Sequence, residues 1–419
     1  MSVKTGLILA GGGARAAYQV GVLRGVAALL PPDVQQPFPI ITGTSAGAIN
    51  ALGLAGRSGS FRSRTRALAA VWASLDSDAV YRTDAGGVMR NGFRMLWALL
   101  RNNQANERPL ALLDNSPLRR LLNDIIEFKR VDSAIAKGEL EGLGITSMNY
   151  TNGHSTTFYQ AQDHVKPWTR AHRRSVPCQL TVDHLMASSA LPTLFPSVRL
   201  DTHYFGDGAL RQSRPLSPAI RLGAERLFII GVSESGDDFE EDPHSEVAPT
   251  IPQVLGQMLN AVFLDSIQTD LESLQRINAL VEPLNAKQLQ KAGLANMRVI
   301  DTLVISPSRS LSELARDYIS ELPRSMRWFL QKTGSIKTTG SGGALSYILF
   351  EPGYCQRLMQ LGYEDTMAQA EDVRAFFNVA PPSAEKQTST HSPRRGLTGR
   401  QNGLTKRWLQ LIGRTGTKV

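Results

Sequence analysis

GTSAGA, residues 43–48, lies between an apolar run typical of a buried strand and an alanine-rich segment typical of a helix. So short a turn forces its tip residue, Ser45, into an uncommon backbone conformation and brings the flanking chain very close. Gly43 and Gly47, two residues before and after the serine, relieve that crowding. We interpret the stretch as a nucleophile elbow, which presents a serine hydroxyl at a helix N-terminus. The alternative is a turn that is simply rich in small residues.

A run of glycines precedes the elbow strand. AGGGARA, residues 10–16, closes a predicted buried strand over residues 5–11 and leads into a helix predicted over residues 14–30. Successive glycines let backbone N–H groups point outward at a helix N-terminus, where they can stabilise a developing oxyanion. The predicted oxyanion hole comprises Gly11, Gly12, Gly13 and Arg15, with Arg15 either adding positive charge or anchoring the loop.

The same glycines also match a dinucleotide-binding fingerprint, Gly11-x-Gly13-x-x-Ala16, which is weak evidence when it stands alone. That fingerprint needs an acidic residue at the end of the second strand to hold the ribose. Here the second strand ends at the elbow, and Asp33 precedes it. No cysteine and histidine cluster has the spacing of a metal site. We therefore expect neither a cofactor nor a metal.

A serine nucleophile needs a general base, and Asp207 is the better candidate for it. An ordinary α/β-hydrolase has several strands before its elbow and a histidine late in the chain, whereas only one strand here precedes the elbow strand. His184 and His203 lie near the segment that holds Asp207, but we expect structural roles for both. Asp207 lies in YFGDGAL, where a glycine on each side keeps the carboxylate accessible in a tight turn.

The remaining pattern alternates strands with helices. Strands are predicted at 142–151, 155–160, 226–233 and 299–308, and helices at 183–196 (stopped by Pro192), 250–280, 310–331 and 344–378, with further helical segments over 61–127. This order predicts an α/β fold with helices on both faces of a mostly parallel central sheet.

Composition and charge are those of an ordinary globular enzyme with an unusual tail. Apolar residues make up 42% and charged residues 20% of the 419 positions, and no apolar stretch is long enough to span a bilayer. The apolar run near the N-terminus is too short for a signal peptide, and the two cysteines cannot form a disulfide framework. We therefore expect a reducing, cytoplasmic location. Residues 381–419 hold eight basic residues and one acid, so they carry +7 of the net charge of +9.

Four segments together resemble the patatin-like phospholipases. They are GGGARAAYQVGVL (11–23), GTSAGA (43–48), ASSALPTLFP (187–196) and DGA (207–209). The resemblance is strong over residues 5–235, weaker through residues 353–366, and absent from the tail. The chain departs from the family at Ala16, where a glycine is usual, and we expect a small adjustment of helix packing there.

The resemblance implies a Ser–Asp dyad without a catalytic histidine, in a three-layer α/β/α fold. Ser45 would be the nucleophile and Asp207 the base, with Gly208 and Ala209 completing the DGA motif. The implied activity is hydrolysis of lipid carboxylic esters of the phospholipase A or lysophospholipase type, with phospholipid or another acyl-ester lipid as partner and no nucleic acid. The alternative is an inactive relative that binds a lipid or a protein.

The expected organisation has four parts. These are a catalytic core (1–235), an acidic loop (236–249), a helical part with one late strand packed on the core (250–380) and a basic, disordered tail (381–419). FRMLWALL, residues 93–100, would form a wall or lid of an acyl pocket, or ordinary core. Residues 404–414 would form a basic amphipathic helix that touches a membrane surface, or merely part of a solubilising tail.

Overall fold

Five parallel strands form the centre of the sheet in the computed structural model. Their order is β10-β9-β1-β2-β3, with bounds β1 Thr5–Leu9, β2 Ile40–Thr44, β3 Gly142–Asn149, β9 Arg226–Ile230 and β10 Asp301–Ile305. The structure describes residues 3–82, 90, 111–232, 265–294, 297–324, 326–327 and 342–380. The predicted mostly parallel sheet is confirmed in this central part.

Beyond β3 the sheet is mixed, because most of its pairs are antiparallel but β6 runs parallel to β4. The strands there are β4 (Ser155–Ala161), β5 (Thr169–Arg170), β6 (Arg173–Pro177), β7 (Val198–Leu200) and β8 (His203–Asp207). β3 pairs with both β4 and β8 in antiparallel fashion, so it joins the two halves of the sheet. The predicted strand pair at 142–151 and 155–160 is confirmed, and Gly153 takes a positive φ of 69° in the turn between them.

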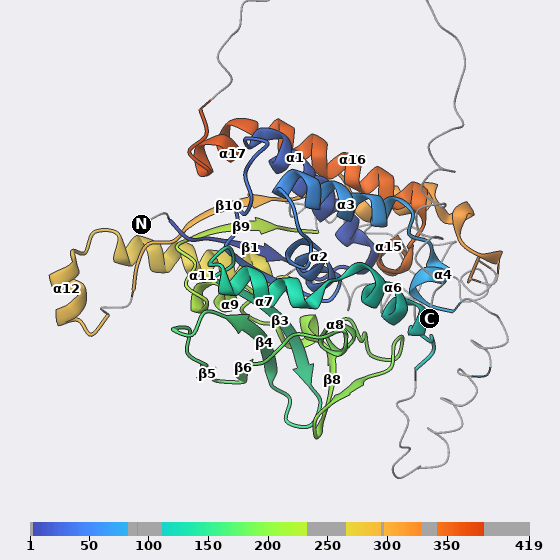
Figure 1. Ribbon diagram of the computed structural model, residues 1–419, viewed down its shortest axis with the longest axis horizontal. Helices are drawn as coiled ribbons and strands as arrows, with labels where there is room; N and C mark the ends of the chain where they lie inside the picture. Colours follow the sequence, from blue (N-terminus) through green and yellow to red (C-terminus); the bar gives the residue numbers. More distant parts are fainter. Residues whose placement is uncertain are drawn as a thin grey trace, which may run out of the picture. The chain divides into compact units, whose positions relative to one another are not determined.

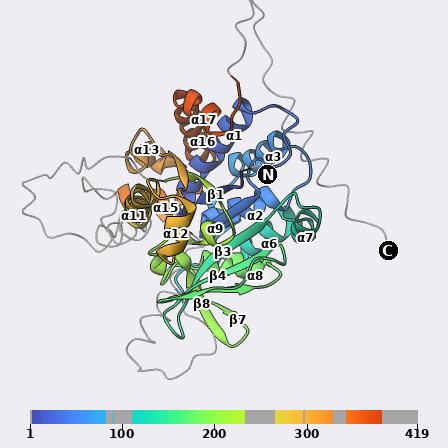
Figure 2. The same ribbon diagram turned by 90° about the vertical axis from the view of Figure 1, so that its left-hand side faces the viewer.

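Alternating side chains of the central strands supply two hydrophobic cores. Leu7 and Leu9 of β1 lie in one core, and Ile8 between them lies in the other. The first core is covered by α1 (Ala17–Leu29), α2 (Ala46–Ala55), α3 (Phe61–Ala73) and α16 (Pro352–Ala368), and the second by α9 (Ser217–Arg221) and α11 (Asp265–Val281). Figures 1 and 2 show these helices on opposite faces of the sheet, so the predicted three-layer α/β/α fold is confirmed.

The remaining elements are shorter. They are α4 (Ser77–Val80), α6 (Ser116–Ile125), α7 (Phe128–Ala136), α8 (Val182–Ser188), α12 (Ala286–Lys291), α13 (Leu311–Asp317), α15 (Gly342–Ile348) and α17 (Ala370–Phe376), with 3-10 turns η1 (Gly13–Ala16), η2 (Gly208–Arg211) and η3 (Ile319–Glu321).

Helix α16 packs along α1, although more than 300 residues separate them in the sequence. The hydroxyl of Tyr18 on α1 donates to the Asp365 carboxylate on α16 at 2.9 Å, and both side chains are buried. The backbone N–H of Ser308, just after β10, donates to the same carboxylate at 3.1 Å. This shared acceptor joins the N-terminal helix to elements near the C-terminal end of the described chain.

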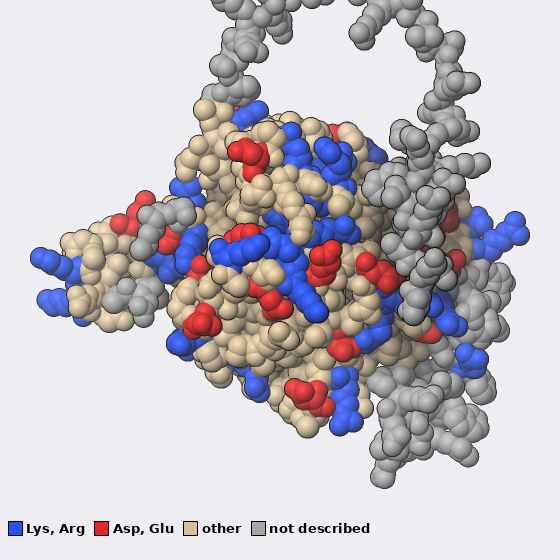
Figure 3. Space-filling view, viewed as in Figure 1, with Lys and Arg blue, Asp and Glu red and all other residues tan. Residues whose placement is uncertain are grey.

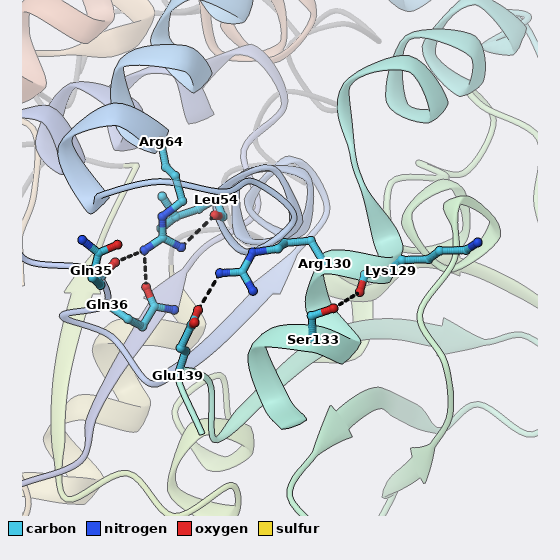
Figure 4. A network of polar contacts seen from close by, with 8 residues as sticks. All are labelled: Gln35, Gln36, Leu54, Arg64, Lys129, Arg130, Ser133 and Glu139. Atoms are coloured by element: carbon cyan, nitrogen blue, oxygen red, sulfur yellow. Dashed lines mark hydrogen bonds and ion pairs between the residues drawn. The ribbon is translucent and has the colours of Figure 1, made fainter. Parts of the chain in front are cut away.

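A polar network involves Arg64 of α3 and Arg130 of α7 (Figure 4). The buried Arg64 donates to the backbone carbonyls of Leu54 and Gln35, while Arg130 on α7 donates to Glu139 at 2.5 Å. Burial, and then the nearby positive charge of Arg130, lower the pKa of Arg64 to about 10. Carbonyl oxygens thus supply the hydrogen-bond acceptors for this buried guanidinium.

The helix predicted within 183–196 is confirmed as α8, but it ends at Ser188 and not at Pro192, where we expected it to stop. The carbonyl of Ala190, two residues later, accepts the N–H of Asp207 at 2.9 Å and cannot continue a helix. Pro192 also disfavours helical geometry in the residue before it. The strand predicted over 226–233 likewise ends early, at Ile230.

Several predictions lie outside the described residues. These are the apolar segment 93–100, the acidic loop 236–249, the first part of the helix predicted over 250–280, and the tail 381–419 with its amphipathic stretch 404–414. Among the residues that the structure describes, no helix is both long enough and apolar enough to span a bilayer. Basic and acidic side chains intermingle over the face shown in Figure 3.

Candidate active site

Ser45 sits at the tip of a strained turn between β2 and α2. Its φ is 55° and its ψ is −129°, so the predicted uncommon backbone conformation is confirmed. The turn is tight enough that a Cβ added at Gly47 would collide with the carbonyl oxygen of Leu9 at the end of β1. The glycines of the elbow are therefore required by close approach of the backbone.

The Ser45 hydroxyl donates a hydrogen bond of 2.6 Å to the Oδ2 atom of Asp207. Asp207 is the last residue of β8, and its other oxygen, Oδ1, accepts the backbone N–H of Ala209 at 2.9 Å. Gly208 between them is buried in the first position of η2. The structure thus brings together the two segments that carried the predicted nucleophile and base.

Burial dominates the electrostatics of this pair. Asp207 has no exposed surface, and burial raises the pKa of its carboxyl from the usual 3.8 to about 7, although the hydrogen bonds from Ser45 and Ala209 act in the opposite direction. A carboxylate with this pKa is a stronger base than an ordinary aspartate and is still about half ionised near neutral pH.

Ser188, at the end of α8, supports the elbow. Its hydroxyl accepts the backbone N–H of Ser45 at 2.9 Å and donates to the carbonyl of Thr146 on β3 at 2.7 Å. This serine lies within the segment ASSALPTLFP, but its sequence pattern predicted no role for it. A role for Ser188 could have been inferred from its position at the end of a helix expected to be buried, because a buried polar side chain needs hydrogen-bond partners.

Gln212 makes a second link between the elbow and β3. The hydroxyl of Thr44, the residue before Ser45, donates to the side-chain Oε1 atom of Gln212, and the Gln212 Nε2 atom donates to the Thr146 hydroxyl at 3.3 Å. Gln212 directly follows η2, so it ties the chain beyond Asp207 to the strand before Ser45. Sequence reasoning missed this residue, because nothing local marks it.

The glycine loop lies beside the elbow. Gly13 and Ser45 line one pocket, and within the described residues the N–H groups of Gly12 and Gly13 donate no hydrogen bond to the protein. Gly13 has a φ of 54°, and a Cβ there would collide with the carbonyl oxygen of Tyr347. Gly11, which precedes them, is buried just beyond the end of β1. Two donors are thus available in the loop.

Arg15 contacts residues near the C-terminal end of the described chain. Its backbone N–H donates to the Gly12 carbonyl at 3.0 Å, and its guanidinium donates to Ser346 and Ser312 at 2.8 Å each. The guanidinium carbon also lies 4.1 Å from the centre of the Tyr347 ring. Of the two roles expected for Arg15, these contacts favour the anchor of the loop.

A buried amide network joins the glycine loop to the elbow helix. Gln19 donates to the carbonyl of Ala10 at 2.7 Å and accepts from Asn50 on α2 at 2.9 Å. Asn50 also donates to the carbonyl of Ala16 at 3.0 Å and accepts the Trp72 indole N–H at 2.8 Å. The methyl group of Ala16 is buried in the core.

An apolar pocket opens next to Ser45. It is lined by Gly13, Ser45, Ala46, Ile49, Leu68, Val71, Trp72, Leu75, Val80, Leu118, Leu121, Leu122, Ile125, Ser189, Leu191, Phe195, Tyr347, Ile348 and Phe350. Helices α3 and α6 and the end of α15 supply much of this lining. Sequence reasoning placed an acyl wall at residues 93–100 and did not name this lining.

No histidine within the described residues hydrogen-bonds to Ser45 or Asp207. His184 instead caps α8, where its Nδ1 accepts the backbone N–H of Thr181 at 3.1 Å. His203 begins β8 and is half-buried. Both positions agree with the structural roles expected for these two histidines.

A family model described as patatin-like phospholipase matches residues 7–220. Similar solved structures include VipD from Legionella pneumophila, with 13% identity, coverage of 88% of this chain and 67% of that chain, and a TM-score of 0.36. Another is the structure of full-length SpcU in complex with full-length ExoU from the type III secretion system of Pseudomonas aeruginosa, with 17% identity, coverage of 82% and 70%, and a TM-score of 0.25. These two likenesses are too weak to indicate function. No curated protein matches the chain.

The raised pKa of Asp207 can be measured directly. We expect its carboxyl carbon to titrate near pH 7 in NMR spectra of the labelled protein. In Ser45→Ala the midpoint should rise further, because that variant loses a hydrogen bond that favours the ionised form. Ser74→Ala, which changes an exposed serine elsewhere, should leave the midpoint unchanged. A midpoint near the usual 3.8 in the wild type would contradict this description of the site.

Proposed function

The chain belongs to the patatin-like phospholipase family, and from that premise we propose that it is a serine acyl hydrolase acting on carboxylic esters of lipids. The observation that carries the proposal is the 2.6 Å hydrogen bond between the Ser45 hydroxyl and the buried Asp207 carboxylate. This hydrogen bond lies at the strained turn of Ser45, and the pocket beside Ser45 is almost wholly apolar. We propose the phospholipase A or lysophospholipase type, with a Ser–Asp dyad.

In the proposed reaction, the Ser45 oxygen attacks the ester carbonyl carbon while Asp207 accepts the serine proton. The N–H groups of the loop formed by Gly11, Gly12 and Gly13 stabilise the negative oxygen that forms. The alcohol then leaves with the proton from Asp207, and Ser45 keeps the acyl group. Water attacks this acyl-enzyme with Asp207 again as base, which releases the fatty acid and restores the serine.

The raised pKa of Asp207 supports this role. A serine hydroxyl is a weak acid, so a carboxylate with an ordinary pKa near 4 would be a poor acceptor for its proton. Burial brings the pKa of Asp207 to about 7, which strengthens the base and leaves a useful fraction ionised at neutral pH. We propose that this burial takes the place of the histidine found in a Ser-His-Asp triad.

The other elements of the site supply support. We propose that Ser188 and Gln212 hold the elbow at the distance from β3 at which Ser45 reaches Asp207. We propose that Arg15 fixes the glycine loop against Ser346 and Tyr347, so that the loop donors keep their direction. None of these three residues needs to touch the substrate.

Loss of either dyad residue should abolish activity. We expect Ser45→Ala and Asp207→Asn each to lower kcat for p-nitrophenyl acyl ester hydrolysis by on the order of 10⁴ or more. Ser74→Ala and Asp163→Asn, which change exposed residues, should retain activity. In the wild type, kcat/KM should rise with pH up to about 7 and then level off, because only ionised Asp207 accepts the proton.

A fluorophosphonate probe separates this proposal from its alternative, an inactive relative that binds a lipid or a protein. Labelling of the wild type and not of Ser45→Ala is expected. A folded wild type that stays unlabelled would favour the inactive relative. In the activity assay, a fully active Asp207→Asn variant would contradict the proposed role of Asp207 as the base of a dyad.

We propose that the acyl chain lies in the apolar pocket beside Ser45. Leu121 on α6 lines it, so Leu121→Phe should shorten the space available to the chain. The expected result is that the ratio of long-chain to short-chain ester hydrolysis falls by about tenfold. Leu280→Phe, at a position that is 72% exposed, is the matched control. Equal losses on both esters would indicate general destabilisation instead.

We propose that the basic tail brings the enzyme to anionic membrane surfaces. Residues 381–419 carry a net charge of +7, and each basic residue near such a surface contributes about 1 kcal/mol. Truncation after Ala380 should spare hydrolysis of a soluble ester and weaken co-sedimentation with anionic liposomes, most clearly at low salt. Equal sedimentation of both forms would refute this role.

A further inference from the structure

A second hollow lies on the far side of α3 from the acyl pocket. Helices α1, α3 and α16 pack side by side here (Figures 1 and 2). The lining of the groove includes five alanines, namely Ala27, Ala28, Ala69, Ala70 and Ala73. Such small side chains do not fill the space between the helices, and a groove of about 870 Å³ remains open to solvent.

The walls of this groove are basic. Arg24 of α1 and Arg62 and Arg66 of α3 line it, together with Gln356, Gln360 and Tyr363 of α16, and no acidic residue is among its lining. Within the described residues none of the three arginines forms an ion pair. Arginines elsewhere do so, for example Arg226 with Asp301 at 3.2 Å. The groove therefore concentrates positive charge that the described chain leaves uncompensated.

Two of the three arginines contact uncharged groups of the protein, so they keep their positive charge. Arg62 donates from Nε and Nη2 to the carbonyl of Ala27 at 3.1 and 3.0 Å, and from Nη2 to the carbonyl of Leu30 at 3.3 Å, and these bonds neutralise no charge. The guanidinium carbon of Arg24 lies 5.9 Å from the centre of the Tyr363 ring. Glu364, the acid that follows Tyr363 on α16, already accepts from Arg357 and Gln360 at 3.4 and 3.0 Å.

We propose that this groove binds a phosphate-bearing ligand. Guanidinium groups offer forked donors that match phosphate oxygens, and Arg24 and Arg66 line one concave surface with such groups. Arg62, whose Nε and Nη2 are held by backbone carbonyls, adds its positive charge to the same surface. Such a surface also focuses the field and attracts multiply charged anions. The site is separate from the proposed active site, because Leu68, Val71 and Trp72 of α3 face the acyl pocket while Arg66 and Ala70 face the groove. It goes beyond the proposed function and does not depend on it.

The test uses the full chain and inorganic phosphate. Sodium phosphate, exchanged against sodium chloride at constant ionic strength, should raise the Tm of the wild type in a saturating manner. In Arg24→Gln/Arg66→Gln the half-saturating concentration should rise at least about tenfold, because two of the three guanidinium groups are lost. Arg276→Gln/Arg316→Gln removes the same charge from exposed positions on α11 and α13 and should respond like the wild type.

A second arm identifies the source of the phosphate. Co-sedimentation is measured with phosphatidylcholine vesicles that do or do not contain phosphatidylglycerol, in protein truncated after Ala380 and in the full chain. Weaker binding of the groove variant to the anionic vesicles would indicate a lipid head group, whereas an effect on free phosphate alone would indicate a soluble ligand. No saturating shift in the wild type, or equal shifts in the groove and control variants, would overturn the proposal.

Discussion

The hydrogen bond between Ser45 and Asp207 joins residues that are 162 positions apart, and its geometry depends on the register of one strand, β3. In the pairing with β2, Thr146 of β3 lies opposite Thr44, the residue before Ser45. In the pairing with β8, Ser147 of β3 lies opposite Asp207 itself. Adjacent residues of β3 therefore set the positions of the elbow and of the DGA turn. A slip of one residue in either pairing would carry one of the two groups toward the other face of the sheet.

Holding these two groups together has a cost that the surrounding structure must offset. Ser45 keeps a positive φ, and Asp207 is buried without a cationic partner among its hydrogen bonds within the described residues. Ser188 and Gln212 add hydrogen bonds from the elbow to β3, and Asn50 and Gln19 join the elbow helix to the glycine loop. The site is thus supported by buried polar contacts on several sides, as a strained and desolvated arrangement requires.

The C-terminal part of the described chain also belongs to the site. The family match ends at residue 220, yet Tyr347 packs against Gly13 and Ser346 accepts from Arg15. Phe350 and Ile348 line the apolar pocket, and the Tyr18–Asp365 hydrogen bond joins α16 to the helix that follows the glycine loop. The N-terminal motifs therefore need residues more than 300 positions away to complete the loop and the pocket.

The elbow, the glycine loop and the DGA turn could be predicted from local sequence, because tight turns demand glycine at particular positions whatever surrounds them. Alternation of strands and helices likewise predicted helices on both faces of the sheet. Local sequence did not predict that Ser188 supports Ser45, that Arg15 reaches Ser346, or that α8 ends at Ser188. Each of these depends on a partner far away in the chain, and strand register and helix packing bring such partners together without leaving a local pattern.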